Sequence, residues 1–143
     1  MTTYLTRAEA VTGTNTKKVE FFSDFLDSFA RTPYGNQLGR VTNEQSVTQS
    51  LKNIILTNLG ERLFQPFIGS NVNAFLFEPN SGQFQTLIES YIDNAITNNE
   101  PRVNTQEISV NLVDDYSIQI SIVYNLINNP IPLTFAFLLK RVR

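Results

Sequence analysis

The chain of 143 residues is long enough for one domain. Its 11 Lys and Arg residues and 13 Asp and Glu residues give a net charge of −2, which argues against binding nucleic acid through phosphate contacts. Cysteine and histidine are absent from the sequence, which excludes disulfides, Cys or His zinc sites and catalytic arrangements built on either residue. The sequence contains no apolar run near the roughly 18 residues of a membrane span, and it begins without the apolar segment of a signal peptide, so we expect no membrane partner and synthesis in a cytoplasm.

The first 41 residues divide into two segments of different composition. Residues 1–20 are polar and rich in Thr, so we expect an N-terminal arm that is disordered or becomes ordered on a partner. Residues 21–143 are expected to form a single domain. Within it, residues 21–41 predict an irregular segment held against the core by its aromatic rings, which are Phe21, Phe22, Phe25, Phe29 and Tyr34.

The pattern then predicts a first helix over about Asn43–Asn58. Thr42 and Gln45 have the spacing of a capping box at its start, and Gly60 is placed as the left-handed residue that follows its end. The stripe of this helix at helical spacing consists of Val47, Leu51, Ile54, Ile55 and Asn58.

A second helix is predicted over about Gly82–Asn98, where the helical period is strongest. Pro and Gly residues mark a loop between the two helices, with one helical turn expected at Asn71–Phe77. The apolar stripe of the second helix consists of Phe84, Leu87, Ile88, Tyr91, Ile92, Ala95 and Ile96.

After Pro101 the apolar period changes to two, which predicts strands. Ile108–Leu112 and Ile118–Leu126 alternate apolar and polar residues, Asp114 and Asp115 make the turn between them, and a third strand is expected over Leu133–Leu139. Two main helices followed by a three-stranded antiparallel meander give an α+β fold, with the irregular aromatic-rich segment at its N-terminal side.

The third strand is apolar on both faces. Leu133, Phe135, Phe137 and Leu139 share one face, while Ala136 and Leu138 stand on the other. An edge strand of this kind invites aggregation unless it is covered. Two interpretations remain open: the N-terminal arm or a loop of the same chain covers it, or another chain covers it or adds a strand to it.

Several spaced motifs resemble one known family. Residues 56–70 read LTNLGERLFQPFIGS, similar to the LxTxxGERxFxPxFGS pattern of the phage baseplate wedge proteins that initiate the tail sheath, a family shared with a baseplate component of type VI secretion systems. Residues 95–103 read AITNNEPRV, similar to the AIxxxEPRI pattern of that family, and Leu76-Phe77-Glu78 lies at the expected spacing. Asp114-Asp115-Tyr116 and residues 127–130 resemble the T4-type branch, and the resemblance covers about residues 21–140.

Charged residues in these motifs are the candidate site. Pro101 stops the second helix between Glu100 and Arg102, and the planar guanidinium of Arg102 suits bidentate recognition of a carboxylate. From the residues alone, an intramolecular salt bridge or a solvated cap is an equally open interpretation. The resemblance implies that a wedge-docking set binds the helical core bundle of neighbouring wedge proteins; this set is Gly60, Glu61, Arg62, Glu100, Pro101 and Arg102.

The resemblance implies a structural protein without a cofactor or enzymatic activity. It would reside in the tail baseplate of the virion, in several symmetric copies, assembled in the host cytoplasm. Its partners would be other wedge proteins and the tail sheath protein, whose terminal arms would add strands to the sheet. The sheath-facing residues would be Leu133, Phe135, Ala136, Phe137, Leu138 and Leu139.

Two alternatives remain. One is a type VI secretion homologue of the same family. The other is a cell-wall glycosidase, which would need two carboxylates about 5–9.5 Å apart across a sugar cleft. The sequence supplies candidates for such a pair: Glu61, Glu78, Glu89, Glu100 and Glu107.

Overall fold

The computed structural model describes residues 19–32, 35, 37–77, 83–114 and 117–140. A short antiparallel pair of strands, β1 (Ser23–Phe25) and β2 (Arg40–Thr42), leads into helix α1 (Glu44–Leu56). A helical turn α2 (Val72–Phe75) and the long helix α3 (Phe84–Asn99) follow, and the chain ends in three strands, β3 (Val103–Asp114), β4 (Ser117–Leu126) and β5 (Asn129–Lys140). The predicted α+β fold is confirmed, whereas most of the predicted arm lies outside the described residues.

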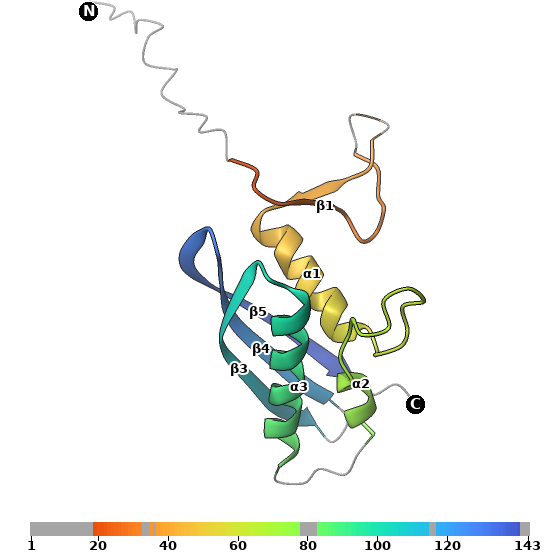
Figure 1. The fold of residues 1–143 in the computed structure, drawn as a ribbon, viewed down its shortest axis with the longest axis vertical. Helices are drawn as coiled ribbons and strands as arrows, with labels where there is room; N and C mark the ends of the chain where they lie inside the picture. The colour runs from red at the N-terminus through yellow and green to blue at the C-terminus, as the bar shows by residue number, and fades with distance from the viewer. Residues whose placement is uncertain (1–18, 33–34, 36, 78–82, 115–116, 141–143) are drawn as a thin grey trace, which may run out of the picture.

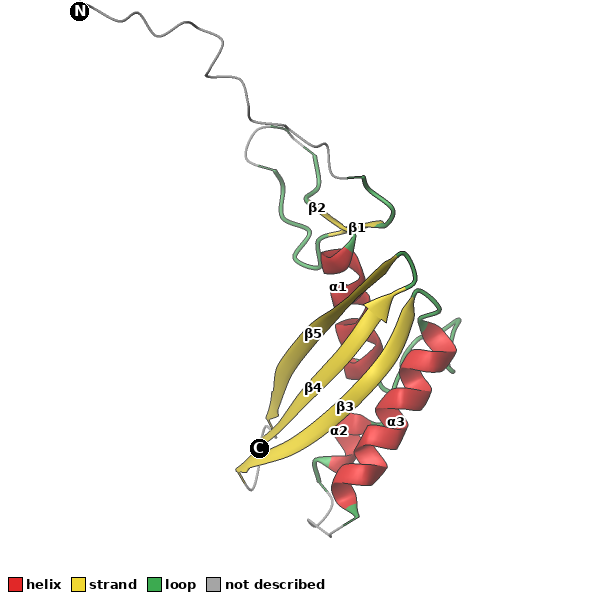
Figure 2. Cartoon of the chain, turned by 90° about the vertical axis from the view of Figure 1, so that its left-hand side faces the viewer, coloured by secondary structure: helices red, strands yellow, loops and turns green. Residues whose placement is uncertain are grey.

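The three long strands form an antiparallel meander in the order β3-β4-β5. In register, Val110 lies opposite Ile120, which lies opposite Phe137, and these rows face the helices. Both long helices lie on this one side of the sheet, with α3 along β3 (Figure 2). The opposite face carries Ser109, Ser121 and Ala136 in one row, so it is mainly small or polar.

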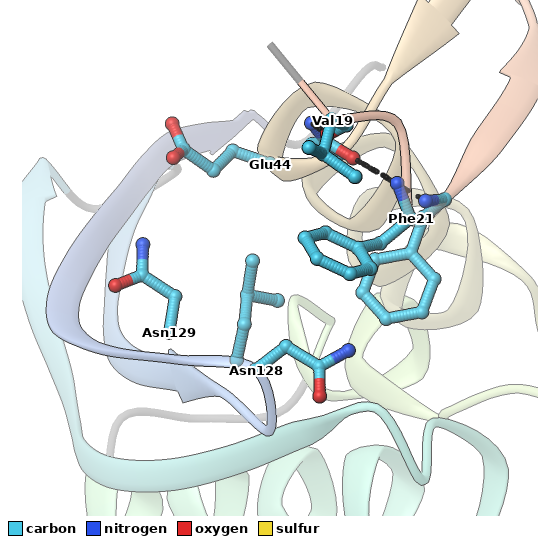
Figure 3. Close-up of a pocket in the computed structure, with 8 residues that line it drawn as sticks. Val19, Phe21, Glu44, Asn128 and Asn129 are labelled. Atoms are coloured by element: carbon cyan, nitrogen blue, oxygen red, sulfur yellow. Dashed lines mark hydrogen bonds between the residues drawn. The ribbon is translucent and has the colours of Figure 1, made fainter.

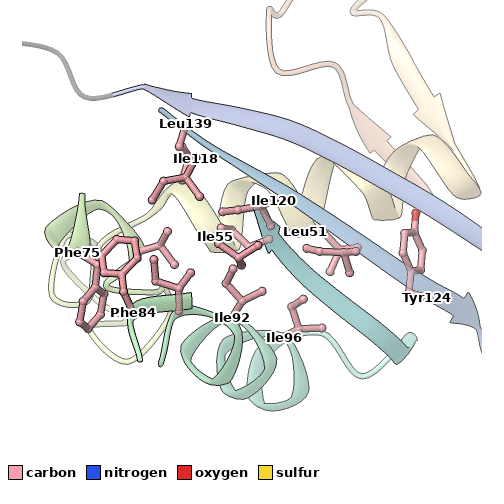
Figure 4. Close-up of a cluster of buried hydrophobic side chains, with 14 of the residues drawn as sticks. Leu51, Ile55, Phe75, Phe84, Ile92, Ile96, Ile118, Ile120, Tyr124 and Leu139 are labelled. Atoms are coloured by element: carbon pink, nitrogen blue, oxygen red, sulfur yellow. The ribbon is translucent and has the colours of Figure 1, made fainter. Parts of the chain in front are cut away.

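The core fills the space between the sheet and the two helices (Figure 4). Leu51 and Ile55 of α1 meet Ile92 and Ile96 of α3, and all four are completely buried. Each such side chain contributes about 1.5–3 kcal/mol by leaving water, so the core is the main source of stability. Tyr124 ties α1 to the sheet through a 2.9 Å hydrogen bond between its hydroxyl and that of Thr48.

The helices confirm the predicted periods. The four apolar residues of the stripe predicted for the first helix are buried in α1, whereas its fifth residue, Asn58, is exposed and lies beyond the end of α1 at Leu56. The turn expected at Asn71–Phe77 is α2. In α3 the residues Leu87 and Tyr91 remain part-exposed at the margin of the stripe, where the Tyr91 ring packs 4.8 Å from the Phe75 ring. None of the described helices is both long enough and apolar enough to cross a membrane.

The predicted capping box is wrong. The residue that precedes α1 is Asn43, with a positive φ of 50°, and it makes no side-chain cap bond. Its side chain turns back to the N-terminal segment instead: the carbonyl oxygen accepts from the backbone N–H of Phe21 at 2.8 Å, and the amide donates to the carbonyl of Val19. Gly60 has the predicted positive φ, but it lies in a turn beyond Thr57, the residue that caps α1, and does not itself end the helix.

The prediction that the N-terminal aromatic rings hold their segment to the core is also wrong for most of them. Phe21, Phe25 and Phe29 are exposed, whereas Phe22 packs against the core and Tyr34 lies outside the described residues. Backbone pairing between β1 and β2 orders the segment instead. This hairpin stands beyond the end of the helix-and-sheet layers, where the core cannot reach its rings (Figure 1).

Candidate functional site

The junction between α3 and β3 holds an ion pair within the chain. The Nε of Arg102 donates to Oε1 of Glu100 at 2.6 Å, and Nη2 donates to Oε2 at 2.7 Å, so the guanidinium grips the carboxylate with two parallel bonds. The side chain of Glu100 is 3% exposed and that of Arg102 is 33% exposed. The structure thus realises the bidentate geometry expected of Arg102, with Glu100 of the same chain as its partner.

Two further elements close around this pair. The hydroxyl of Ser50, in the middle of α1, donates to Oε2 of Glu100 at 2.5 Å. The ring of Phe22, next to β1, lies under the guanidinium of Arg102, 5.3 Å from the carbon to the ring centroid. The pair therefore joins the N-terminal segment, α1, α3 and the sheet at one point.

The environment favours the charged forms of both partners. Burial alone would raise the pKa of Glu100, but the hydrogen bonds from Arg102 and Ser50 outweigh it and lower that pKa. The hydrogen bond to Glu100 raises the pKa of Arg102, against the opposing effect of its burial. A buried carboxylate held in this way is a structural anion, and it has the opposite tuning from the raised pKa of a general acid.

The other predicted docking residues lie elsewhere, in the loop between α1 and α2. Gly60, Glu61 and Arg62 are exposed, and the structure records no hydrogen bond or ion pair that joins them to Glu100 or Arg102. The carboxylate of Glu61 accepts the backbone N–H of Asn58 at 2.9 Å. The predicted docking set is therefore divided between a buried junction and an exposed loop.

The most exposed apolar side chains of the described residues lie in that same loop and were missing from the predicted site. Leu63, Phe64 and Phe67 are 92%, 96% and 87% exposed; we call these three residues the apolar tip. The sequence signal was available in the GERLFQPF motif. Leu63 and Phe67 have helical spacing, but Pro66 and the flanking Gly60 and Gly69 interrupt a helix there. Apolar residues among such helix breakers indicate a loop, and the structure shows that their side chains face outward.

The predicted sheath-facing residues all lie on β5, at an edge of the sheet. Leu133, Phe135, Phe137 and Leu139 share one face, as predicted. This face turns toward the helices, so their side chains pack on the core, and the Phe135 and Phe137 rings stack at 5.1 Å. Ala136 and Leu138 are exposed on the other face, with Leu138 at 57%. Beside Ala136 and Leu138, β4 presents Gln119 and Ser121, so this part of the face is mixed.

The two edges of the sheet differ in what covers them. At the β3 edge α3 runs alongside, and the carboxylate of Glu89 accepts the outward N–H of Val110 at 3.2 Å. At the β5 edge no helix of the described chain lies alongside (Figure 2). The sheet is therefore closed at one edge and open at the other.

Two hollows of the surface differ in the ionisable side chains that line them. One lies between Phe21 and the β4–β5 turn at Asn128 and Asn129 (Figure 3), and among the described residues that line it Glu44 is the one ionisable side chain. An open groove between α3 and β3 carries Glu89, Asp93 and Glu107. The described residues contain no group of three or more His, Cys, Asp or Glu that could hold a metal ion.

Comparisons with known proteins give a family match and a curated relative. Residues 41–131 match the family model described as baseplate wedge protein gp25. A curated relative, baseplate wedge protein gp25 of Enterobacteria phage T4, is 30% identical over 114 residues, which cover 78% of this chain and 84% of the relative.

Solved structures share the fold. A putative tail lysozyme from Geobacter sulfurreducens is similar with a TM-score of 0.64 at 20% identity, over 70% of this chain and 92% of that one. A chain of the anti-feeding prophage baseplate is similar with a TM-score of 0.59 at 16% identity, and the match covers 82% of this chain and 83% of that one. A chain of the postcontracted pyocin R2 baseplate is similar with a TM-score of 0.55 at 18% identity, and the match covers 68% of this chain and 96% of that one.

Proposed function

The chain belongs to the family of baseplate wedge protein gp25, and we propose that it joins the wedge core of a contractile phage tail to the first ring of sheath subunits, whose polymerisation it nucleates. The matched region extends from β2 to the start of β5 and so includes the α1–α2 loop, the Glu100–Arg102 junction and most of the sheet. The wedge would be bound at the loop and the junction. The sheath would be bound at the sheet.

Wedge docking at the junction would use Pro101 and the N–H groups of Arg102 that do not bind Glu100. Pro101 is exposed, and Arg102 commits only Nε and Nη2 to Glu100. A guanidinium carries five N–H donors, so the Nη1 side remains able to bind a partner carboxylate or carbonyl. Glu100 would act indirectly, by holding Arg102 in place.

Sheath binding would use the outer edge of β5. The N–H of Val110 points away from β4, and backbone groups of successive residues in an antiparallel sheet face alternate neighbours. The register from Val110 through Ile120 to Phe137 then turns the backbone groups of Phe137 toward β4 and those of Ala136 outward. Thr134 and Leu138 face outward for the same reason, so an added strand would find a row of free donors and acceptors.

The open β5 edge is the observation that carries the sheath proposal. Ala136→Pro removes one outward N–H without removing a bond to β4, and proline is tolerated on edge strands. We expect baseplates that carry this variant to assemble but to bear short sheaths or none, scored by negative-stain electron microscopy. Ala136→Val is the matched control, because it changes the side chain and keeps the donor, so its sheaths should be of normal length. Normal sheaths with Ala136→Pro would refute the role of this edge.

A glycosidase is the second candidate, because the fold is shared with a putative tail lysozyme. The carboxylate of Glu100 is unsuited to acid catalysis, since it is bound by Arg102 and Ser50 and its pKa is lowered. Glu89 and Glu107 remain in the open groove beside β3. We propose that the chain has no such activity, and clearance of a cell-wall suspension that is lost with Glu89→Gln or Glu107→Gln would refute this.

A further inference from the structure

The apolar tip presents an unusual amount of hydrophobic surface for so few residues. Leu63, Phe64 and Phe67 are each at least 87% exposed, and together they present on the order of 500 Å². The largest apolar patch on a typical monomer measures about 300–600 Å² and is often functional. The loop projects from the end of α1, away from the helices and the sheet (Figure 1).

The backbone holds this loop in one shape. The N–H of Gly60 donates to the carbonyl of Pro66 at 2.8 Å and closes the tip, while Ser70 donates to Thr57 at 2.8 Å and closes the base. Gly69 packs so tightly that a Cβ at its position would lie 2.5 Å from the Thr57 carbonyl oxygen. An exposed hydrophobic group that is already ordered loses little further conformational entropy on binding, which is the property of a preformed anchor.

The tip is continuous with the surface proposed to dock the wedge. A shallow hollow joins Leu59 and Phe67 of the loop to Asn94 and Asn98 on the last turns of α3, and Asn99 lines it immediately before Glu100. Glu61 and Arg62 lie between Gly60 and Pro66, directly before Leu63 of the tip, and their charges cancel. The whole surface therefore has an apolar projection, an amide-lined margin and no net charge from the loop.

From these features we propose that the apolar tip inserts into an uncharged apolar cleft on a neighbouring wedge protein, and that this protein continues over the α3 amides to Arg102. This inference rests on the proposed function and names the chemistry of the partner surface. A projecting anchor needs a concave partner, and Phe64 and Phe67 would fill the cleft as buried aromatic hot spots.

The area of the tip argues against a second copy of this chain as the occupant. Two tips that met face to face would bury about 1,000 Å² in total, below the roughly 1,200–2,000 Å² of stable specific interfaces. The tip supplies about 500 Å² of the roughly 800 Å² that one partner contributes to a standard interface, and the adjoining α3 surface can supply the rest.

The test measures binding to the complex of the remaining wedge proteins of the same phage, assembled without this chain and immobilised for biolayer interferometry. Phe64→Ser and Phe67→Ser should each weaken binding of the full chain by about 30-fold or more. Phe29→Ser is the matched control, because Phe29 is 67% exposed in the connection between β1 and β2, away from the tip, and its affinity should match the wild type. Thermal unfolding of all three variants should follow that of the wild type.

Each other outcome overturns a distinct statement. If the tip variants bind as well as Phe29→Ser while the wild type binds the complex, the tip is no anchor and the proposed function stands. If light scattering shows that the wild type dimerises and that Phe64→Ser abolishes the dimer, the occupant is a second copy. If the wild type does not bind the complex at all, the proposed wedge function fails, and this inference fails with it.

Discussion

The segments that follow the two long helices use the same residue types in opposite ways. After α3, Glu100 and Arg102 bind each other, and the guanidinium of Arg102 lies over the ring of Phe22. After α1, Glu61 and Arg62 are exposed, and the hydrophobic residues beside them face outward too. The first segment is held by side chains, the second by backbone bonds around two glycines with positive φ. A charged motif can therefore belong to the internal structure, and an apolar motif to the surface.

The largest loss of stability is expected from replacing Arg102 at the junction. Arg102→Ala leaves the nearly buried carboxylate of Glu100 with Ser50 as its remaining side-chain partner, and removing one partner of a buried pair costs about 3–5 kcal/mol. Because Arg102 is one-third exposed, we expect a loss near the lower end, about 3 kcal/mol, in urea unfolding.

Arg62→Ala is the control from the other segment, and its effect should stay within about 0.5 kcal/mol because the side chain is exposed. Equal losses of stability for Arg102→Ala and Arg62→Ala would show that side-chain contacts hold the two segments equally. Because the pair is internal, we expect any loss of assembly with Arg102→Ala to come from lost stability as well as from lost docking.

A second prediction concerns the backbone of the exposed loop. Gly69→Ala places a Cβ 2.5 Å from the Thr57 carbonyl at a φ of +138°, so the loop base must open, at about 2 kcal/mol. Gly60→Ala meets no atom within 4 Å and suffers only from its φ of +84°, at about 1 kcal/mol. Urea unfolding of both variants measures these two losses in the free energy of unfolding. A Gly69→Ala variant as stable as the wild type would show that backbone packing does not fix this loop.

Periodic patterns predicted the layers of this fold and could not predict the site. The stripe from Val47 to Ile55 and the alternation from Ile118 to Leu126 report burial on one face, which is a local property of a helix or strand. The partner of Arg102 depends on Ser50 and Phe22, which reach the junction from distant parts of the chain. A local period in the sequence does not report contacts between distant segments. The sequence therefore could not distinguish an internal ion pair from a solvated cap at Glu100 and Arg102.

The errors share a cause as well. The rings of Phe21, Phe25 and Phe29 were expected to be buried because aromatic residues usually are, yet their hairpin lies beyond the layers that could cover them. At Thr42 and Gln45 the capping pattern was outcompeted by Asn43, whose side chain binds the N-terminal segment.

A third prediction, with a smaller effect than Arg102→Ala or Gly69→Ala, separates the charge of Glu100 from its shape. Glu100→Gln keeps nearly the same side-chain volume and removes the charge that Arg102 and Ser50 stabilise, so we expect it to cost about 1.5 kcal/mol at pH 7. Because the pKa of Glu100 is lowered in the folded chain, its charged form stabilises the fold above the unfolded-state value near 4.5, and this stabilisation is lost as the pH falls through the lower folded value.

The difference in free energy of unfolding between wild type and Glu100→Gln should therefore be constant from pH 7 to about pH 5 and shrink below pH 4.5. Urea unfolding at each pH measures it. Glu61→Gln is the control from the exposed segment, where the carboxylate bonds one backbone N–H, and its difference from the wild type should remain small throughout. If the Glu100→Gln difference instead grew on acidification, the folded state would be holding this carboxyl in its neutral form. The junction would then be a site of raised pKa, as acid catalysis requires, and the structural role assigned to Glu100 would have to be given up.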